Sequence, residues 1–311
     1  MAESGGLAYI FPGQGAQAVG MGRDLYDNFA SVRAVFQQAD EVTGTALTKL
    51  CFEGPEEELR RTINSQPALL TVSLACIKAI QEISGKELPP PAFVAGHSLG
   101  EYTALAMAGV FDYSTAIYLT RQRGRLMHEA GQQNPGGMVA VLGLEEAVLL
   151  DVCRETDTII ANSNCPGQYV ISGNEKNLAR ASELAKAKGA NRVRPLQVSG
   201  AFHSSLMQPA AEGLREILNQ ITLRLPRIPV IANVTAQPIS TVEQIKNELI
   251  TQLCTGVQWQ RSVEYMINNG VTTFIEIGPG KVLTGLNKRI SDRAYNININ
   301  DTLSIKEYLK A

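Results

Sequence analysis

The stretch PAFVAGHSLGEYTALAMA, residues 91–108, decides how the first half of this chain folds. Its apolar run at 92–96 predicts a buried strand, and residues 99–108 predict a helix. Between them stands Gly-His-Ser-Leu-Gly, residues 96–100, which fits the pattern G-x-S-x-G. The strand must turn sharply into the helix, and the flanking glycines permit the close packing of that turn. The pattern therefore predicts that Ser98 is exposed at the amino end of a helix.

Two interpretations of Ser98 are open from these residues alone. In one, Ser98 is a nucleophile, and the backbone amide of Leu99 donates to the oxyanion that develops when the serine attacks a carbonyl. In the other, Ser98 only caps the helix in a tight turn. The position between a predicted strand and a predicted helix favours the nucleophile.

Predicted strands and helices alternate on both sides of this stretch. Expected elements before residue 131 are strands at 7–11 and 92–96 and helices at 22–28, 31–43, 64–83, 99–108 and 113–129. Later elements of the same kind are strands at 230–233 and 273–277 and helices at 242–253 and after 280. This alternation is typical of an α/β core with a mostly parallel sheet.

A different order of elements is predicted for residues 131–198. Strands are expected at 138–142, 158–161, 169–172 and 192–196, and helices at 145–155 and 175–188. The order β-α-β-β-α-β is the split βαβ arrangement of a ferredoxin-like unit. We therefore expect a small subdomain at 131–198, inserted into a large α/β domain formed by 1–130 and 199–311.

The composition is that of an ordinary globular protein of 311 residues, with 44% hydrophobic and 19% charged residues. The net charge of −2 and the sparse aromatic residues argue against a nucleic-acid partner. Five cysteines without a CxxC pair predict neither a disulfide framework nor a zinc site, and they favour a reducing compartment. No signal peptide or membrane span is expected. The expected location is the cytoplasm, or a plastid or mitochondrion if a transit peptide was removed from a longer precursor.

A nucleophilic serine needs a nearby base, and the chain has three histidines. His97 adjoins the serine, so its side chain should point away from Oγ. His128 lies near the end of a predicted helix, where a solvent-facing position is expected. By elimination, His203 is the candidate base, at a loop-to-helix junction after the small subdomain. Because no Asp or Glu presents itself as a third member, we expect a backbone carbonyl to orient this imidazole.

Five motifs together resemble a known family. They are FPGQGAQ at 11–17, GHSLGE at 96–101, RGRLM at 123–127, GAFHS at 200–204 and EIGPGKVL at 276–283. In this order they resemble the malonyl-CoA:acyl carrier protein transacylases of type II fatty acid synthesis and the acyltransferase domains of polyketide synthases. The resemblance implies a hydrolase-like core with an inserted ferredoxin-like subdomain.

The resemblance also implies roles for single residues. Ser98 would carry the acyl group and His203 would be the base. Gln14 would provide or support the oxyanion hole together with the amide of Leu99. The histidine would be held by a backbone carbonyl near Val-Gln-Trp at 257–259, which places the matching position at Gln258.

Two further positions would define the acyl group. The resemblance implies that Arg123 binds the free carboxylate of malonate, which suits the two-pronged guanidinium. Without the resemblance, we would expect Arg123 to be a surface arginine on a helix that also carries Arg121 and Arg125. Phe202 would disfavour an α-methyl branch, because in this family Ala-Phe-His-Ser accompanies malonyl units.

The expected activity is transfer of malonate from malonyl-CoA to the phosphopantetheine thiol of acyl carrier protein, through a malonyl-serine ester and a ping-pong mechanism. No metal or cofactor is expected, and we expect a monomer. The acidic carrier proteins of this family suggest contacts on Lys186, Lys188, Arg192 and Arg194. Alternatives are a stand-alone acyltransferase of a polyketide pathway, a serine thioesterase or hydrolase with the same elbow, and a non-catalytic docking protein.

Overall fold

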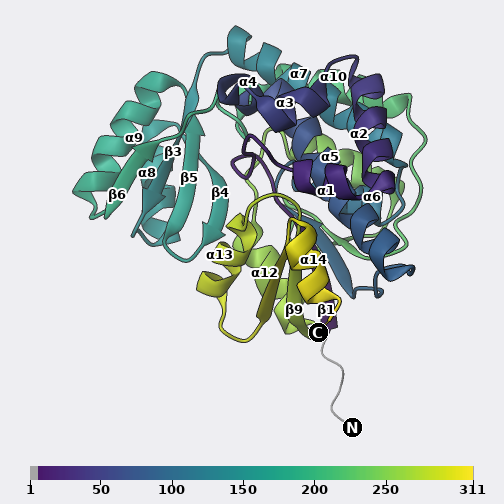
Figure 1. Ribbon diagram of the computed structural model, residues 1–311. Helices are drawn as coiled ribbons and strands as arrows, with labels where there is room; N and C mark the ends of the chain where they lie inside the picture. The colour runs from purple at the N-terminus through teal and green to yellow at the C-terminus, as the bar shows by residue number, and fades with distance from the viewer. Residues whose placement is uncertain (1–5, 311) are drawn as a thin grey trace.

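The computed structural model describes residues 6–310 and contains two separate sheets (Figure 1). The larger, sheet A, has the strand order β10-β9-β1-β2-β7-β8. Its strands are β1 (Gly6–Phe11), β2 (Phe93–Gly96), β7 (Val230–Ile231), β8 (Pro238–Ile239), β9 (Val271–Ile277) and β10 (Tyr295–Ile299). All neighbouring pairs are parallel except β7 and β8. The mostly parallel sheet expected from the alternation of elements is therefore confirmed.

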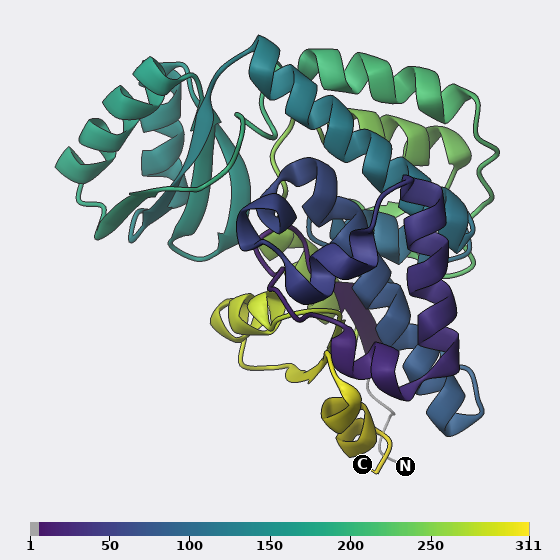
Figure 2. The ribbon, with the colours of Figure 1, turned by 45° about the horizontal axis from the view of Figure 1, so that its top comes forward.

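Helices cover both faces of sheet A (Figure 2). The helices before sheet B are α1 (Arg23–Asn28), α2 (Ala30–Thr43), α3 (Leu47–Glu53), α4 (Glu56–Arg60), α5 (Thr62–Ser84), α6 (Gly100–Met107) and α7 (Tyr113–Gln133). Those after it are α10 (Gln208–Asn219), which follows a 3-10 turn at Ser205–Met207, α11 (Val242–Thr251), α12 (Trp259–Asn268), α13 (Val282–Ile290) and α14 (Thr302–Tyr308). The two faces of the sheet therefore build two cores.

The central strand β1 shows how the two cores divide. Tyr9 and Phe11 lie in the core that includes α2, α5 and α6. Ala8 and Ile10 point to the other face, where they join Trp259 of α12 in the second core. Successive side chains of a strand alternate between faces, so these four buried residues contribute to both cores.

The smaller sheet B is antiparallel, with the strand order β4-β5-β3-β6. It consists of β3 (Gly137–Leu142), β4 (Ile159–Cys165), β5 (Gln168–Gly173) and β6 (Arg192–Pro195), with α8 (Glu146–Thr156) and α9 (Glu175–Ala187) between them. These helices and one face of the sheet form a third core. The order of elements predicted for 131–198 is confirmed, and the unit forms a lobe of its own in Figure 1.

Helix α5 has the length and hydropathy of a membrane span, although no apolar run of that length was expected from the sequence. Of its most apolar 18-residue window, 83% is buried inside the protein. It packs against α7 and α2 rather than presenting an apolar surface. Its composition is therefore that of a central core helix.

The turn from β2 into α6 depends on two glycines. A Cβ atom on Gly96 would lie 1.9 Å from the carbonyl carbon of Gly100, and a Cβ on Gly100 would lie 2.1 Å from the carbonyl oxygen of Phe11. Both contacts are with backbone, which cannot move away as a side chain could. Strand β1, strand β2 and helix α6 therefore meet at a distance that only glycine permits.

We predict that Gly100→Ala lowers the free energy of unfolding by at least about 3 kcal/mol, because the added methyl overlaps the backbone of β1. Gly285→Ala in α13 is the matched control. A Cβ there meets nothing within 4 Å, so this change should be neutral or stabilising by about 0.5–1 kcal/mol. Denaturant unfolding measures both, and equal stabilities of the two variants would contradict the packing argument.

Candidate active site

Ser98 stands at the point where β2 gives way to α6, in a strained backbone conformation with φ 50°. Asn233, which follows β7, braces this turn. Its side-chain oxygen accepts from the Ser98 amide at 2.6 Å, and its Nδ2 donates to the Gly96 carbonyl at 2.7 Å. The left-handed conformation is thereby held from a neighbouring strand, and the serine hydroxyl projects out of the turn.

His203 meets this serine across 105 residues of sequence. Its Nε2 lies 2.9 Å from Ser98 Oγ. Its Nδ1 lies 2.6 Å from the backbone carbonyl of Gln252, at the end of α11. A carbonyl can only accept, so Nδ1 carries the proton and Nε2 is free to accept one from the serine. The expected backbone-carbonyl acceptor is present.

The residue that supplies this carbonyl differs from the expectation, which was Gln258. The Gln258 carbonyl instead accepts from the amide and hydroxyl of Ser262, because Gln258 is the first residue before α12 and its carbonyl begins the hydrogen bonds of that helix. The backbone N–H of Gln258 donates to the Asn233 carbonyl at 2.8 Å. The orienting position is therefore Gln252, six residues earlier.

Burial is the main influence on the charge state of His203. The ring is 4% exposed, and burial together with the nearby positive charge of Arg123 lowers its pKa from 6.5 to about 3. The imidazole is therefore neutral at neutral pH. The hydrogen bond to the Gln252 carbonyl opposes this shift only in part.

Arg123 is the third group at Ser98 and is only 1% exposed, so it is not the surface arginine that its helix alone would suggest. Its Nη2 donates to Ser98 Oγ at 3.1 Å and to Gln252 Oε1 at 2.8 Å, and its Nη1 donates to Gln66 Oε1 at 2.6 Å. The guanidinium lies over the ring of Tyr102, 5.5 Å from its centroid. A fixed cation therefore stands beside the hydroxyl.

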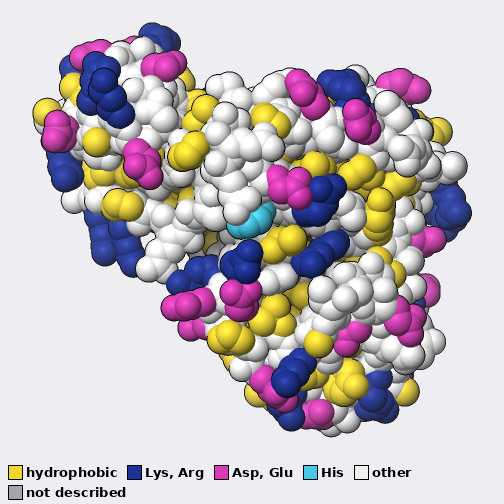
Figure 3. Space-filling view, turned by 90° about the horizontal axis from the view of Figure 1, so that it is seen from above, with side chains coloured by type: hydrophobic (Ala, Val, Ile, Leu, Met, Phe, Trp, Pro, Cys, Tyr) yellow, Lys and Arg dark blue, Asp and Glu magenta, His cyan; other side chains and the backbone are white. Residues whose placement is uncertain are grey.

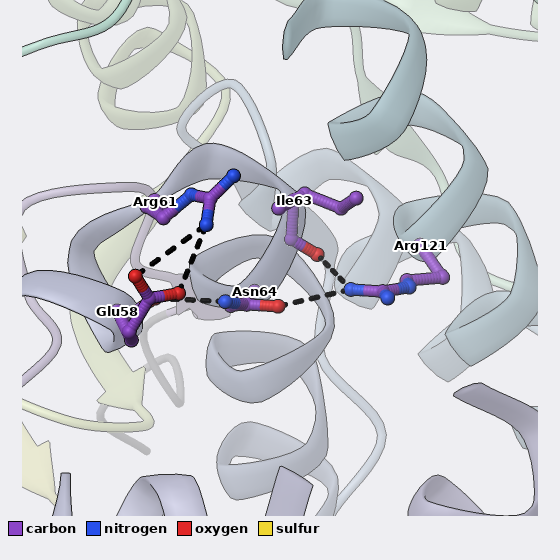
Figure 4. Close-up of polar contacts among 5 residues, drawn as sticks. All are labelled: Glu58, Arg61, Ile63, Asn64 and Arg121. Carbon is purple, nitrogen blue, oxygen red and sulfur yellow. Dashed lines mark hydrogen bonds and ion pairs between the residues drawn. The ribbon is translucent and has the colours of Figure 1, made fainter. Parts of the chain in front are cut away.

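Arg121, on the same helix, does not contact Ser98 but binds residues of α5 (Figure 4). Arg121 donates from Nη1 to the Ile63 carbonyl at 2.9 Å and to the Asn64 side chain at 3.0 Å. Asn64 in turn donates to the Glu58 carbonyl at 2.8 Å. Arg121 thus fastens α7 to the first turn of α5, the helix that also carries Gln66 toward Arg123.

Gln14 and Leu99 line the same pocket as the serine. Gln14 follows β1, and its side-chain oxygen accepts from Thr62 at 3.1 Å. Within residues 6–310, neither the backbone N–H of Gln14 nor the backbone N–H of Leu99 donates to another protein group. Leu99 directly precedes α6, where the helix dipole favours negative charge. Two unused backbone donors are therefore available at the place expected for an oxyanion hole.

A pocket of about 520 Å³ surrounds the Ser98 hydroxyl. Its lining includes Arg123 and His203, which lie outside sheet B. Sheet B contributes further lining side chains, such as Met138 and Val170. Phe202 lies in the lining next to His203 and is 4% exposed. The serine thus lies between the two sheets, with room for an acyl chain.

Of the other two histidines, one lies as expected from the sequence and the other does not. His97 turns away from the serine as expected, and its Nε2 lies 2.9 Å from Asn164 Oδ1 of β4. His128 was expected to face solvent, but it is half-buried on α7, and its Nδ1 is buried without a hydrogen-bond partner among the described residues. Neither competes with His203 for Ser98.

Four amide side chains of the site were not found from the sequence: Gln66, Asn164, Asn233 and Gln252. They lie on four separate segments and belong to none of the five motifs. Asn and Gln are common on surfaces, so only their burial in the folded chain marks these as functional. The sequence holds no local signal that would have singled them out.

A strained serine at a strand–helix elbow, paired with a neutral histidine, defines a class of enzymes that form acyl-serine esters. Residues 8–302 match the family model of the acyl transferase domain, and the chain belongs to this family. It is 46% identical over 308 residues to the malonyl CoA-acyl carrier protein transacylase of Bacillus subtilis (strain 168), covering 96% of this chain and 95% of that protein. The resemblance drawn from the five motifs is thus confirmed.

Solved structures agree with this membership. The acyl carrier protein S-malonyltransferase from Vibrio cholerae O1 biovar eltor str. N16961 superposes with a TM-score of 0.93 at 43% identity, covering 97% of this chain and 99% of that one. A malonyl-transacylase in complex with a type II PKS acyl-carrier protein has a TM-score of 0.93 at 42% identity, covering 98% and 99%. The whole described fold is therefore shared.

We predict that the His203 imidazole stays neutral, with its proton on Nδ1, down to about pH 4, because burial lowers its pKa to about 3. From about pH 6.5 downward the unfolded chain binds a proton that the folded chain does not, so this group reduces stability as the pH falls. Nitrogen-detected NMR of the histidine rings, assigned with His203→Gln, measures this. A midpoint near pH 6.5 for this ring would contradict the assignment.

Proposed function

We propose that this enzyme transfers a malonyl group from malonyl-CoA to the phosphopantetheine thiol of acyl carrier protein, in fatty acid biosynthesis. The observation that carries the proposal is the buried guanidinium of Arg123, 3.1 Å from the hydroxyl that His203 activates. A cation fixed beside the nucleophile suits an acyl group that keeps its own negative charge. The malonyl transferase names of the relatives described above point to the same acyl group.

In the first half-reaction, Ser98 Oγ attacks the thioester carbonyl of malonyl-CoA while His203 Nε2 takes its proton. The tetrahedral oxyanion is stabilised by the amides of Gln14 and Leu99, which have no protein acceptor among the described residues. When the intermediate collapses, the C–S bond breaks, and the proton on His203 passes to the departing thiolate of CoA. The product is a malonyl ester of Ser98.

In the second half-reaction, the phosphopantetheine thiol of the carrier protein enters where CoA left. His203 takes the proton of this thiol, and the sulfur attacks the ester carbonyl. The C–O bond then breaks, and the proton returns to Ser98 Oγ. The two substrates use one site in turn, which is a ping-pong order, and no step draws on a metal or cofactor.

The carboxylate of the malonyl group pairs with Arg123, whose planar fork can donate two parallel hydrogen bonds. Phe202 lies beside His203 in the pocket wall, where its ring limits space around the α-carbon. One methyl group in an apolar pocket changes binding by about 1–3 kcal/mol. The proposed role of Phe202 is therefore a preference for malonyl over methylmalonyl units.

Two alternative functions share this geometry. A serine thioesterase or hydrolase would resolve the acyl-serine with water instead of a thiol. A stand-alone acyltransferase of a polyketide pathway would use the same chemistry on another carrier protein, and the relative solved with a type II PKS acyl-carrier protein gives this alternative a specific precedent. A non-catalytic docking protein would need none of the alignment found at Ser98.

We further propose that 1–130 with 199–311 forms a large hydrolase-like domain and that 131–198 forms a ferredoxin-like subdomain. The β-α-β-β-α-β order and the antiparallel order β4-β5-β3-β6 support the second assignment. The strand–elbow–helix at Ser98 on a parallel sheet supports the first. On this division the active site lies where the two units face each other.

The carrier protein is proposed to dock beside the small subdomain. Basic side chains are spread over the left lobe, which carries sheet B, and along the notch beside it (Figure 3). Four exposed basic side chains are proposed to contact the acidic carrier. Lys186 lies on α9, Lys188 directly follows α9, and Arg192 and Arg194 lie on β6. This end of the subdomain would complement a negatively charged partner.

A monomer is proposed as the active form, because Ser98, His203 and Arg123 all come from one chain. A reducing compartment, the cytoplasm or an organellar matrix or stroma, is proposed from the five cysteines, all of which carry free thiols.

We predict that malonyl-CoA adds one malonyl group to the intact chain, detected by mass spectrometry, and that Ser98→Ala abolishes the adduct. On addition of acyl carrier protein, the label should pass to the carrier. Release of free malonate at a rate that carrier protein does not change would establish a hydrolase instead. Absence of both an adduct on the unaltered chain and released malonate would establish a non-catalytic protein.

We predict that Arg123→Ala slows malonyl transfer by about 100-fold or more, since two charge-assisted hydrogen bonds are worth about 3 kcal/mol together and each 1.4 kcal/mol is tenfold. Acetyl transfer should hold or rise, because an acetyl group carries no free carboxylate for Arg123 to bind. Arg125→Ala, which removes a surface partner of Glu129 on the same helix, is the control and should change neither rate much. Equal losses for both acyl groups would show that Arg123 is structural.

A further inference from the structure

The guanidinium of Arg123 is a buried cation whose direct partners, among the described residues, are all uncharged. It donates to Gln66, Gln252 and Ser98 and lies over the ring of Tyr102. No carboxylate lies within ion-pair distance of it in the described part of the chain. A charge buried without an opposite charge nearby is strongly unfavourable, so a compensating group is expected in a second layer.

Glu101 occupies that second layer, separated from Arg123 by the side chain of Gln252. The amide Nε2 of Gln252 donates to Glu101 Oε2, and its Oε1 accepts from Arg123 at 2.8 Å. The other oxygen of Glu101 accepts from the Asn233 amide at 3.1 Å. Glu101 is 0% exposed, and this burial raises its pKa, whereas the hydrogen bonds that both of its oxygens accept favour the ionised form.

A second buried carboxyl, Glu248 of α11, lies against Glu101 and accepts from the Val234 amide at 2.9 Å. Burial raises the pKa of both groups, to about 7 for Glu248, and their mutual repulsion prevents both from being ionised together. The two side chains therefore share one proton. The pair then holds one negative charge, and the two N–H groups that donate to Glu101 favour its placement on the side that faces Gln252.

We propose that Glu101 is a positioning residue for the substrate carboxylate: acting through Gln252, it offsets the charge of Arg123 without occupying the guanidinium itself. A direct Glu–Arg pair would cover the two-pronged edge that malonate needs, and the substrate would have to displace it. With an amide between the two charges, the Nε of Arg123 keeps no hydrogen-bond partner among the described residues, and Nη2 reaches the Ser98 oxygen that carries the acyl group. The inference rests on the proposed function, because it requires an acyl group that carries a carboxylate.

The side chain of Gln252, which lies between Glu101 and Arg123, also explains why a carboxylate is needed at position 101. Both neighbours of Glu101, the Asn233 amide and Gln252 Nε2, are donors. In Glu101→Gln, the new amide nitrogen must face one of them, unless Gln252 reverses and presents its own NH₂ to Arg123. The variant therefore loses both the compensating charge and the fixed orientation of Gln252.

The loss should depend on what Ser98 carries. In the free enzyme and in the acetyl-enzyme of the Glu101→Gln variant, the Gln252 amide no longer bonds a carboxylate, and the remaining carboxyl, Glu248, makes no hydrogen bond to that amide among the described residues. In the malonyl-enzyme, the carboxylate of the acyl group supplies the compensating charge. Malonylation should therefore stabilise the variant more than it stabilises the unaltered protein.

The experiment is thermal unfolding of the unaltered protein, Glu101→Gln and Glu129→Gln. Each is measured free, with excess acetyl-CoA and with excess malonyl-CoA, without carrier protein, and intact mass verifies the acyl group on Ser98. Glu129→Gln is the matched control, because it removes one surface carboxylate from α7. We expect Glu101→Gln to lower Tm by on the order of 5 °C in the free and acetyl states. Malonylation should recover at least about half of that loss, and the control should follow the unaltered protein throughout.

An equal loss of Tm in all three states, or no loss in any, would overturn the proposed role of Glu101. Failure of the unaltered protein to form a malonyl adduct would instead overturn the proposed function, and mass spectrometry shows this separately. If Glu101→Gln does not fold, the double variant Glu101→Gln/Arg123→Met decides the question. Because it removes both buried charges, it should be more stable than Glu101→Gln alone, whereas additive losses would contradict the charge compensation.

Discussion

The hydrogen bond between Ser98 Oγ and His203 Nε2, 2.9 Å long, is the interaction on which the rest of the site depends. It joins the elbow between β2 and α6 to a loop that follows sheet B, 105 residues away. Both residues adopt left-handed backbone conformations, with φ 50° and φ 60°. Such strain persists only where the surroundings fix the chain, here through Asn233 at the serine and the Gln252 carbonyl at the histidine.

Burial acts on this site in two ways. It keeps the His203 imidazole neutral, so that Nε2 can accept a proton at neutral pH. It also removes water from around Arg123, which strengthens any pairing of the guanidinium with a carboxylate. The serine and histidine alone would suit many acyl groups, and on the proposed function the buried arginine selects one that is charged. The general reactivity and the choice of acyl group are therefore assigned to different residues.

The fold could be predicted where the pattern is local. The elbow glycines, the alternation of buried strands and the order of elements in 131–198 are all confirmed by the structure. Helix α12 could also have been predicted, since Trp259, Val263 and Met266 recur at helical spacing. The amide side chains of the site could not. Gln252 is assigned its role by contacts with Ser98, Arg123 and Glu101, which lie far from it in sequence. The Gln258 expectation was wrong for the same reason: a motif locates a segment, but the carbonyl nearest His203 is set by where α11 ends.

The central claim is that the buried guanidinium beside Ser98 receives the carboxylate of the acyl group. The most direct measurement is a crystal structure of the enzyme soaked with malonyl-CoA in the absence of carrier protein. The account predicts a malonyl ester on Ser98 whose carboxylate makes paired hydrogen bonds with Arg123. An ester whose carboxylate points to the mouth of the pocket, with Arg123 still bound only to Gln66 and Gln252, would contradict it.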